Sequence, residues 1–316
     1  MIKRYLINGK FILKILITGA TGLIGGRLVK SLELDKFYIK KVSRKKRKNF
    51  KIINWQSTKN LENLCKNINI VINCAGYDVH SAQKKKQTNK INAEFPYKLY
   101  QAANKNGVEL FIFISTYHVY DFEKLKLINE KSRTKKKNIY TSSKILGEKK
   151  IILFKNKKTK VIIIRPCNLF GYPVYKNENC WHLIVNSMVK DLLIKKKYTI
   201  NSEYNSYRHY SSIRNFCLFI TNLIKRYRNI KFEKKIFIIN YVSNKNLNLV
   251  NLTNIIKKQI KEKKKQIIFK YKKLKKTKSI NFKSNFSNKF YSSRDKYFNF
   301  EIKKIILYVK KNFNYQ

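Results

Sequence analysis

A tyrosine and a lysine stand four residues apart in the stretch NIYTSSK, at Tyr140 and Lys144. On a helix this spacing places both side chains on one face. A lysine ammonium beside a phenol lowers the phenol pKa, so Tyr140 is a candidate general acid or base with Lys144 as its partner. The chain holds 21 tyrosines and is rich in lysine, so such pairs also arise by chance. The pair of Tyr140 and Lys144 is therefore evidence for catalysis only if it lies at a suitable place among the predicted strands and helices.

A cluster of glycines near the N-terminus forms the second chemical motif. Gly19, Gly22 and Gly25 make a GxxGxxG pattern in a chain that has nine glycines in all. A turn with positive φ, a backbone that touches a pyrophosphate and a helix packed close to a strand each exclude a β-carbon. The N-terminus of the following helix attracts phosphate charge. The pattern predicts dinucleotide binding, and the alternative is a tight turn that binds nothing.

The region about 20 residues past these glycines indicates which dinucleotide binds. An Asp or Glu often stands there to bind the adenosine ribose, but this chain has Arg44, in the stretch KKVSRKKRK. A guanidinium suits a 2′-phosphate, so the sequence favours NADP(H) over NAD(H). In a chain this rich in lysine, the alternative is a solvated surface residue.

Both motifs depend on an alternation of strands and helices. Continuous apolar runs predict strands at residues 11–18, 37–42, 52–55, 68–74, 110–115, 160–165 and 236–241. Helical spacing predicts helices after the glycine cluster and at residues 92–106, 140–153, 181–194, 213–228 and 249–260. This alternation predicts an α/β fold with a doubly wound, Rossmann-like parallel sheet. Tyr140 and Lys144 then belong to the helix between the fifth and sixth strands.

The length of 316 residues suits one large domain with a smaller one folded onto it. The alternation is regular up to Pro166 and loosens after it. We therefore predict a dinucleotide-binding domain over residues 1–175 and a mainly substrate-binding region over residues 176–316. The strand at residues 236–241 would return to the main sheet. The lysine-dense tail from Lys261 keeps Phe, Tyr and Ile, so we expect it to be folded at least in part.

Charge and cysteine content limit the class of protein. The formal net charge is +55, from 72 Lys and Arg against 17 Asp and Glu, so non-specific adhesion to nucleic acid is expected. The charge follows no single motif, which favours drift toward AT-rich codons over an RNA-binding function. The five cysteines are scattered without a CxxC pair, so neither a disulfide framework nor a metal site is predicted. No apolar run is long enough to span a bilayer, and we expect a cytoplasmic location.

The motifs resemble, in order, those of the extended short-chain dehydrogenase/reductases, the NAD-dependent epimerase/dehydratase family that acts on nucleotide sugars. TGATGLIGG at residue 18 looks like the cofactor turn of this family, and VINCAG at residue 71 looks like its fourth-strand motif. ISTYHVYD at residue 114 resembles its serine/threonine motif. The stretches NAEFPYKLYQAANKNGV, YTSSK, RPCNLFG and YRHYSSIRN are also similar to family segments. The resemblance covers nearly the whole chain.

The resemblance implies a catalytic triad of Thr116, Tyr140 and Lys144. Tyr140 would move a proton at a sugar hydroxyl or ketone while hydride passes to or from the nicotinamide. With Arg44 included, the expected cofactor contacts are Gly19, Thr21, Gly22, Leu23, Ile24, Gly25, Arg44, Cys74, Ala75, Gly76, Tyr140, Lys144 and Pro166. Expected substrate contacts are Thr116, Asn168 and Arg208. The partner is then a nucleotide-activated sugar, and a homodimer is compatible with this interpretation.

The chain differs from the family at positions that determine which reaction a member catalyses. Tyr117 and His118 stand where members that dehydrate sugars carry Asp–Glu, so a 4,6-dehydratase is disfavoured. We predict an epimerase or reductase that acts on a sugar nucleotide with a nicotinamide cofactor. His118 could act as a second acid or base, although packing or surface placement is the better prediction. The alternative is a non-catalytic RNA-binding relative of the same fold, against which the complete triad argues.

Overall fold

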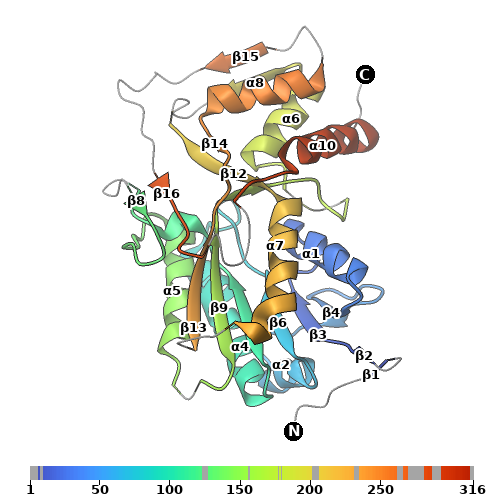
Figure 1. Cartoon of the computed structure of the whole chain (residues 1–316), viewed down its shortest axis with the longest axis vertical. Coiled ribbons are helices and arrows are strands. Elements are labelled where there is room, and N and C mark those ends of the chain that lie inside the picture. Colours follow the sequence, from blue (N-terminus) through green and yellow to red (C-terminus); the bar gives the residue numbers. More distant parts are fainter. Residues whose placement is uncertain are drawn as a thin grey trace.

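The core of the computed structural model is a seven-stranded sheet (Figure 1). In spatial order its strands are β13 (Ile236–Tyr241), β9 (Lys160–Pro166), β7 (Leu110–Ile114), β6 (Ile70–Asn73), β3 (Lys14–Thr18), β4 (Tyr38–Ser43) and β5 (Lys51–Ile52). Every neighbouring pair is parallel. The strand order reverses at β3, and ligands of such sheets bind at this point, outside the carboxyl ends of the strands. The predicted doubly wound α/β fold is confirmed.

The structure describes residues 6–7, 10–122, 127–155, 157–176, 178, 180–200, 206–230, 235–261, 266–269, 281–286 and 293–313. The expectation of a partly folded tail therefore falls in part outside the described residues. Within them, α10 (Phe298–Asn312) is a helix with a buried apolar face, which agrees with that expectation.

The central strands are buried on both faces. Each residue of β6 and β7 is buried, and β3 and β9 are buried except at their first residue. Isoleucines pair across them, as in Ile15 with Ile70 and Ile72 with Ile112. Such continuous apolar runs are what a parallel sheet between two helix layers requires.

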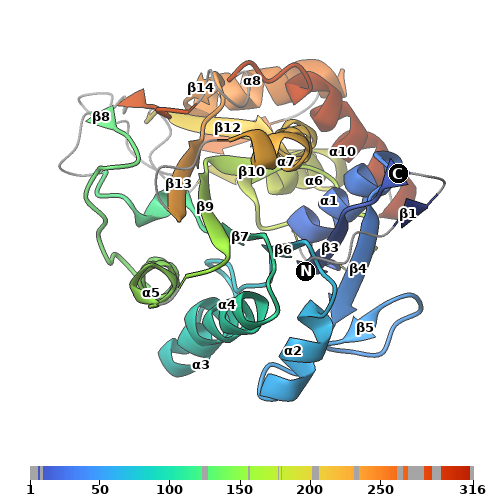
Figure 2. The ribbon, with the colours of Figure 1, turned by 60° about the horizontal axis from the view of Figure 1, so that its bottom comes forward.

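Helices cover both faces of the sheet (Figure 2). α1 (Leu23–Leu34) and α7 (Ile213–Arg226) pack on one face, where Leu28 and Leu32 meet Phe216 in one apolar cluster. α2 (Thr58–Cys65), α4 (Phe95–Lys105) and α5 (Ile139–Leu153) pack on the other face. The carboxyl ends of the strands lie between these two layers and form the base of the site.

The helix predicted over residues 92–106 begins earlier and is interrupted. α3 (Lys85–Asn89) leads into a π-helical turn at Lys90–Glu94, which continues as α4. Within the turn, Asn92 accepts a hydrogen bond from the Tyr77 N–H at 2.7 Å and donates one to the Ser143 hydroxyl at 2.9 Å. These hydrogen bonds explain why the polar Asn92 side chain is buried, which a search for apolar periodicity could not predict. π-helical turns often occur beside functional sites.

A separate apolar cluster joins α6 (Ile184–Ile194), α8 (Leu249–Ile260) and α10. β10 (Asn168–Phe170), β12 (Arg208–Ser212) and β14 (Asn246–Leu247) form a small sheet beside it. The remaining strands form two-stranded pairs, namely β1 (Leu6–Ile7) with β2 (Lys10–Phe11), β8 (Leu127–Ile128) with β16 (Asn281–Phe282), and β11 (Lys197–Ile200) with β15 (Gln266–Phe269). β13 pairs with β9 at the edge of the main sheet.

Several predicted boundaries differ from those observed. The first strand begins at Lys14 rather than residue 11, and the helix expected from residue 181 begins at Ile184, after a turn. Trp55 was expected in a strand but lies in a turn, where it is still 8% exposed. Trp55 is buried by side-chain packing, including its stacking on Phe95, and its apolar character therefore does not indicate a strand. Among the helices of the described chain, none combines the length and apolar content needed to cross a membrane.

Candidate active site

The turn between β3 and α1 is built on glycine. The Gly22 N–H donates to the Gly19 carbonyl oxygen at 2.9 Å, and Gly19 has a φ of +63°. A β-carbon on Gly19 would lie 2.6 Å from the Ala75 nitrogen, and one on Gly25 would lie 2.2 Å from the Gly19 oxygen. Both positions therefore exclude a side chain. Gly22 begins α1 without a side-chain cap, so the first N–H groups of the helix need other partners.

An acidic side chain lies at this helix N-terminus. Glu178 accepts a hydrogen bond from the Leu23 N–H, and its Oε1 lies 3.6 Å from where a β-carbon on Gly22 would stand. Burial raises the pKa of Glu178, while the Leu23 hydrogen bond opposes that rise. The turn thus attracts a negative group, as the macrodipole of α1 predicts.

Two cavities meet over the glycine turn. One has a volume of about 590 Å³, the other about 310 Å³, and both are lined by Gly19, Gly22, Cys74, Gly76 and Glu178. The larger is also lined by the predicted residues Thr21, Arg44 and Ala75. The smaller is also lined by the predicted residues Leu23, Ile24, Gly25, Thr116, Tyr140, Pro166 and Asn168. Of the predicted site residues, all of which are described, Lys144 and Arg208 line neither cavity.

Basic and aromatic side chains line the larger cavity. Arg44 lies just after β4 and is exposed, and Lys45 and Arg47 line the same wall. Trp55 lines the cavity as well and stacks on Phe95, with ring centroids 5.3 Å apart and ring planes 4° from parallel. Cations beside an aromatic surface suit a phosphorylated nucleoside.

Tyr140 is placed by the start of α5. The Asn138 side chain accepts from the Thr141 N–H at 2.9 Å, and the Thr141 hydroxyl accepts from the Asn138 N–H at 3.1 Å. This capping box fixes the first turn, which carries Tyr140. Burial raises the pKa of Tyr140 to about 12, and a hydrogen bond with Thr116 works against that rise. Thr116 and Tyr140 are therefore in direct contact in the smaller cavity.

Lys144 lies one turn further along α5 and is 6% exposed. Its Nζ donates to the Ile114 carbonyl oxygen at 3.0 Å and lies 5.3 Å from the centroid of the Phe113 ring. Burial lowers the pKa of Lys144 to about 8. The expectation that Lys144 lowers the pKa of Tyr140 needs correction, because the ammonium is bound to β7 and the burial of the phenol dominates.

Asn168 and His118 also line the smaller cavity, and Arg208 lies near them on β12. Asn168 donates to the Tyr117 hydroxyl at 2.7 Å. Burial lowers the pKa of His118 to about 4, and the charge of Arg208 adds to this effect, so the imidazole is neutral at pH 7. His118 lines the cavity beside Thr116, whereas Arg208 acts on it through its charge from β12.

Sequence reasoning missed an acid–base pair in the smaller cavity. Asp78 and His182 both line it, and the Asp78 Oδ2 lies 2.8 Å from the His182 Nε2. Burial alone would raise the pKa of Asp78, but hydrogen bonds from His182 and Ser81 hold it well below its usual range. The two residues are far apart in the sequence, so no local pattern could have found them. Within the described ranges, no group of three or more His, Cys, Asp and Glu side chains is placed to hold a metal ion.

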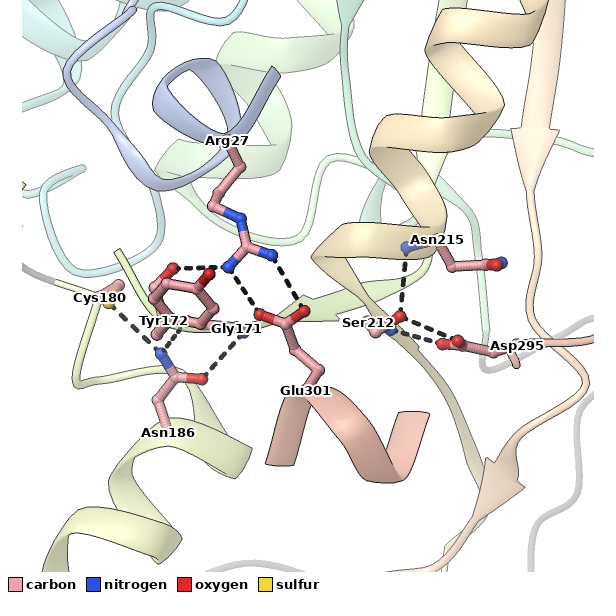
Figure 3. A network of polar contacts seen from close by, with 9 residues as sticks. All are labelled: Arg27, Gly171, Tyr172, Cys180, Asn186, Ser212, Asn215, Asp295 and Glu301. Atoms are coloured by element: carbon pink, nitrogen blue, oxygen red, sulfur yellow. Dashed lines mark hydrogen bonds and ion pairs between the residues drawn. The ribbon is translucent and has the colours of Figure 1, made fainter. Parts of the chain in front are cut away.

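A buried network ties the glycine helix to the C-terminal region (Figure 3). Arg27 of α1 donates to both carboxylate oxygens of Glu301 on α10, at 2.7 and 3.0 Å, and to the Tyr172 carbonyl oxygen at 3.1 Å. The Asn186 side chain bonds both the N–H and the carbonyl oxygen of Gly171, at 3.2 and 2.8 Å. The start of the segment after β10 is thereby fixed beside α1, and further along this segment lie Glu178 and His182.

Comparison with known proteins identifies relatives over most of the chain. The model of the NAD dependent epimerase/dehydratase family matches residues 15–239. The UDP-glucose 4-epimerase of Vibrio cholerae is 31% identical over 176 residues, which are 52% of this chain and 54% of that protein. The match therefore spans about half the length of this curated relative.

Solved structures share the fold over nearly the whole length. The UDP-N-acetylglucosamine 4-epimerase of Methanobrevibacter ruminantium M1, in complex with UDP-N-acetylmuramic acid, has a TM-score of 0.79 at 16% identity and covers 94% of this chain and 98% of its own. The UDP-glucuronic acid 4-epimerase of Bacillus cereus, in complex with UDP-glucuronic acid and NAD, has a TM-score of 0.76 at 17% identity and covers 95% and 99%. TunA, an NAD dependent NDP-hexosamine 5,6-dehydratase, has a TM-score of 0.77 at 15% identity and covers 95% and 98%. At these identities the similarity shows the fold.

Proposed function

Because the chain belongs to the NAD dependent epimerase/dehydratase family, we propose that it is a nicotinamide-dependent enzyme that epimerises or reduces a nucleotide-activated sugar. The observation that carries the proposal is the meeting of Thr116 and Tyr140 with the glycine turn around one cavity. The Vibrio cholerae relative is named for UDP-glucose, and the Bacillus cereus structure holds UDP-glucuronic acid and NAD. These relatives support a UDP-sugar as the substrate class.

The residues of the two cavities fit a dinucleotide. Gly19 and Gly25 leave a cradle that any β-carbon would fill, and the N-terminus of α1 attracts an anion. A pyrophosphate there would take over the contact now made by Glu178. The residues proposed to hold the cofactor are Gly19, Thr21, Gly22, Leu23, Ile24, Gly25, Arg44, Cys74, Ala75, Gly76, Tyr140, Lys144 and Pro166.

The chemistry at the sugar belongs to Tyr140 and its neighbours. A nicotinamide held there would supply the hydride chemistry of the reaction. Tyr140 takes the hydroxyl proton as the ketone forms and returns it when the ketone is reduced, as a general base and acid. Thr116 would hydrogen-bond the same sugar oxygen, and Lys144 would help to hold the cofactor. An epimerase would restore the sugar hydroxyl on the opposite face with no net change of the cofactor, whereas a reductase would need a reduced cofactor for each turnover.

Substrate contacts are proposed for Thr116, Asn168 and Arg208. Asn168 lines the smaller cavity, and Arg208 lies close enough for its charge to act on His118. The division into a cofactor-binding domain over residues 1–175 and a mainly substrate-binding region over residues 176–316 remains a proposal, as does a homodimer.

Tyr140→Phe tests the proposed general acid and base. The variant removes one hydroxyl, so turnover of UDP-sugars should fall by roughly 10²–10⁴ while cofactor binding stays within a few fold. Turnover is followed by chromatography of the sugar nucleotides and cofactor binding by calorimetry. Tyr100→Phe is the matched control, because its hydroxyl is buried and unpartnered within the described residues. An unchanged rate in Tyr140→Phe would contradict the mechanism.

Arg44→Asp tests whether the larger cavity binds a 2′-phosphate. Loss of a charge-assisted contact is worth roughly 1.5–3 kcal/mol, so affinity for NADPH should fall at least tenfold and affinity for NADH much less. Arg226→Asp makes the same charge change at the end of α7, outside the walls of both cavities, and should leave the preference unaltered. Equal affinities of the unmodified protein for both cofactors would remove the basis for an NADP preference.

A further inference from the structure

One buried carboxylate touches two of the segments that enter the proposed active site. Glu148 lies on α5 and is 3% exposed. Its Oε1 accepts a hydrogen bond from the Ser115 hydroxyl at 2.5 Å, and Ser115 directly precedes Thr116. The same carboxylate accepts two hydrogen bonds from Arg165, at 3.1 Å from Nε and 2.5 Å from Nη2, and Arg165 directly precedes Pro166.

The third segment is α5 itself. Tyr140, Lys144 and Glu148 follow one another at intervals of four residues, so they share one face of the helix. Glu148 therefore joins the helix of the proposed acid and base to the ends of β7 and β9. The position of Thr116 relative to Tyr140 depends on this joint, because Ser115 and Thr116 are adjacent in the chain.

Arg165 extends the joint to the far edge of the sheet. Its Nη1 donates to the Tyr120 hydroxyl at 2.8 Å, and that hydroxyl donates to the Asn240 Oδ1 at 2.7 Å. Asn240 belongs to β13, so the chain of contacts runs from α5 through β9 to the edge strand. Each polar side chain in it is buried and hydrogen-bonded, which makes the arrangement rigid.

Glu148 lies one helix turn after Lys144 on the same face of α5, so its charge acts on the Lys144 ammonium. The titratable groups around the Lys144 ammonium are Glu148 on α5 and the Cys74 thiol after β6. Burial raises the pKa of Cys74 to about 12, so this thiol is uncharged at neutral pH. Glu148 is thus the anion that opposes the loss of the Lys144 proton. Its carboxylate is itself paired with Arg165, and the Ile114 carbonyl oxygen accepts a hydrogen bond from the Lys144 ammonium.

We propose that Glu148 is a positioning residue of this site: it holds Thr116 and Pro166 in place against α5 and supplies the negative charge opposite Lys144. The proposal rests on the proposed function, because it assigns Glu148 a task in the same reaction. Glu148 itself lines neither of the two cavities and acts through Ser115, which lines the smaller one, and through Arg165 and Lys144.

Glu148→Gln removes the charge and keeps the shape. Lys144 should then lose its proton at a lower pH, so the pH above which cofactor affinity and turnover decline should fall by on the order of one unit, the effect of one charge a helix turn away. Cofactor affinity is measured by calorimetry between pH 6 and 9, and turnover over the same range. Glu94→Gln is the matched control. Glu94 pairs at 3.0 Å with Lys150, which lies on α5 like Glu148, but Glu94 has no part in the network of Ser115, Glu148 and Arg165.

Two further variants separate position from charge. Glu148→Asp keeps the charge on a shorter side chain, so kcat should fall while the pH dependence stays that of the parent. Ser115→Ala leaves Glu148 and Arg165 in place and should raise backbone hydrogen exchange in peptides that contain residues 115–120. This measurement needs no activity and applies even if Glu148→Gln does not fold.

The outcomes are distinct. Normal cofactor binding and turnover with an unshifted pH dependence in Glu148→Gln would overturn the role in charge, and unchanged exchange in Ser115→Ala would overturn the role in position. If the unmodified protein binds no nicotinamide cofactor and converts no UDP-sugar, the proposed function fails and the task assigned to Glu148 fails with it.

Discussion

Lys144 is a charged side chain in a place where burial works against its charge. Its pKa is lowered from 10.5 to about 8 by burial. Between these two values the unfolded chain binds a proton that the folded chain has lost, so the free energy of unfolding rises with pH in this window. Below pH 8 the folded protein carries the whole cost, which is roughly 3 kcal/mol for a shift of this size. A requirement for stability would not by itself place a lysine at this buried position.

Lys144→Met should therefore change how stability depends on pH. The stability of the variant relative to the parent should be greatest at pH 7 and should shrink by roughly 2–3 kcal/mol by pH 10, because the parent recovers the cost of burying the ammonium. Urea unfolding at pH 7, 8, 9 and 10 measures the difference. Lys149→Met, at an exposed position of the same helix, should show a difference that does not vary with pH. A constant difference for Lys144→Met would contradict the buried charge.

Some residues of the proposed site could be predicted from the sequence and others could not. The interval of four between Tyr140 and Lys144 is local, and the glycine spacing is local too, so both could be found without a structure. The contacts of Glu148 with Ser115 and Arg165 depend on the order of strands in the sheet, which no local spacing contains. The raised pKa of Tyr140 escaped prediction because burial depends on all the elements around the phenol.

Helices and strands show the same difference between features that local sequence predicts and features that depend on distant contacts. Buried strands were predictable because a parallel sheet needs continuous apolar runs, and Ile70–Asn73 and Leu110–Ile114 follow this rule. Element ends were less predictable, since the π-helical turn at Lys90–Glu94 depends on polar contacts of Asn92. The ion pair of Arg27 with Glu301, which joins α1 to α10, links residues too far apart for any periodicity to report.

Gly25 and Gly26 are adjacent in α1 and offer a matched test of the glycine turn. A β-carbon on Gly25 would lie 2.2 Å from the Gly19 oxygen, so Gly25→Ala should displace the turn, cost roughly 1–3 kcal/mol and abolish cofactor binding. A β-carbon on Gly26 would meet its nearest atoms at 3.4 Å, so Gly26→Ala should be neutral or stabilise the helix by up to about 1 kcal/mol. Thermal unfolding and calorimetry with the cofactor measure both effects, and equal behaviour of the two variants would contradict this account.

Positive charge dominates the molecule as a whole. The net charge is +55, and several of the few acids are already committed to buried or half-buried ion pairs, such as Glu301 with Arg27 and Glu148 with Arg165. A third cavity of about 450 Å³ between α1, α7 and α10 is lined by Arg27, Lys30, Arg214 and Lys304. Excess cations over such a surface attract polyanions of any sequence. The same charge is therefore compatible with an enzyme and with an RNA-binding protein.

Salt dependence and sequence preference separate these two functions. For an enzyme with adventitious charge, affinity for single-stranded RNA should fall steeply and linearly on a log–log scale as salt rises, with a slope of about −0.7 per phosphate contacted, and should be the same for unrelated sequences. Tyr140→Phe should leave this affinity unchanged because no charge is lost, although it lowers turnover. Fluorescence anisotropy with two unrelated oligonucleotides between 50 and 300 mM salt measures both properties. An RNA-binding function would instead give tight binding of one sequence at physiological salt together with no turnover of any UDP-sugar, and that result would replace the proposed function while the fold and the glycine turn stayed as described.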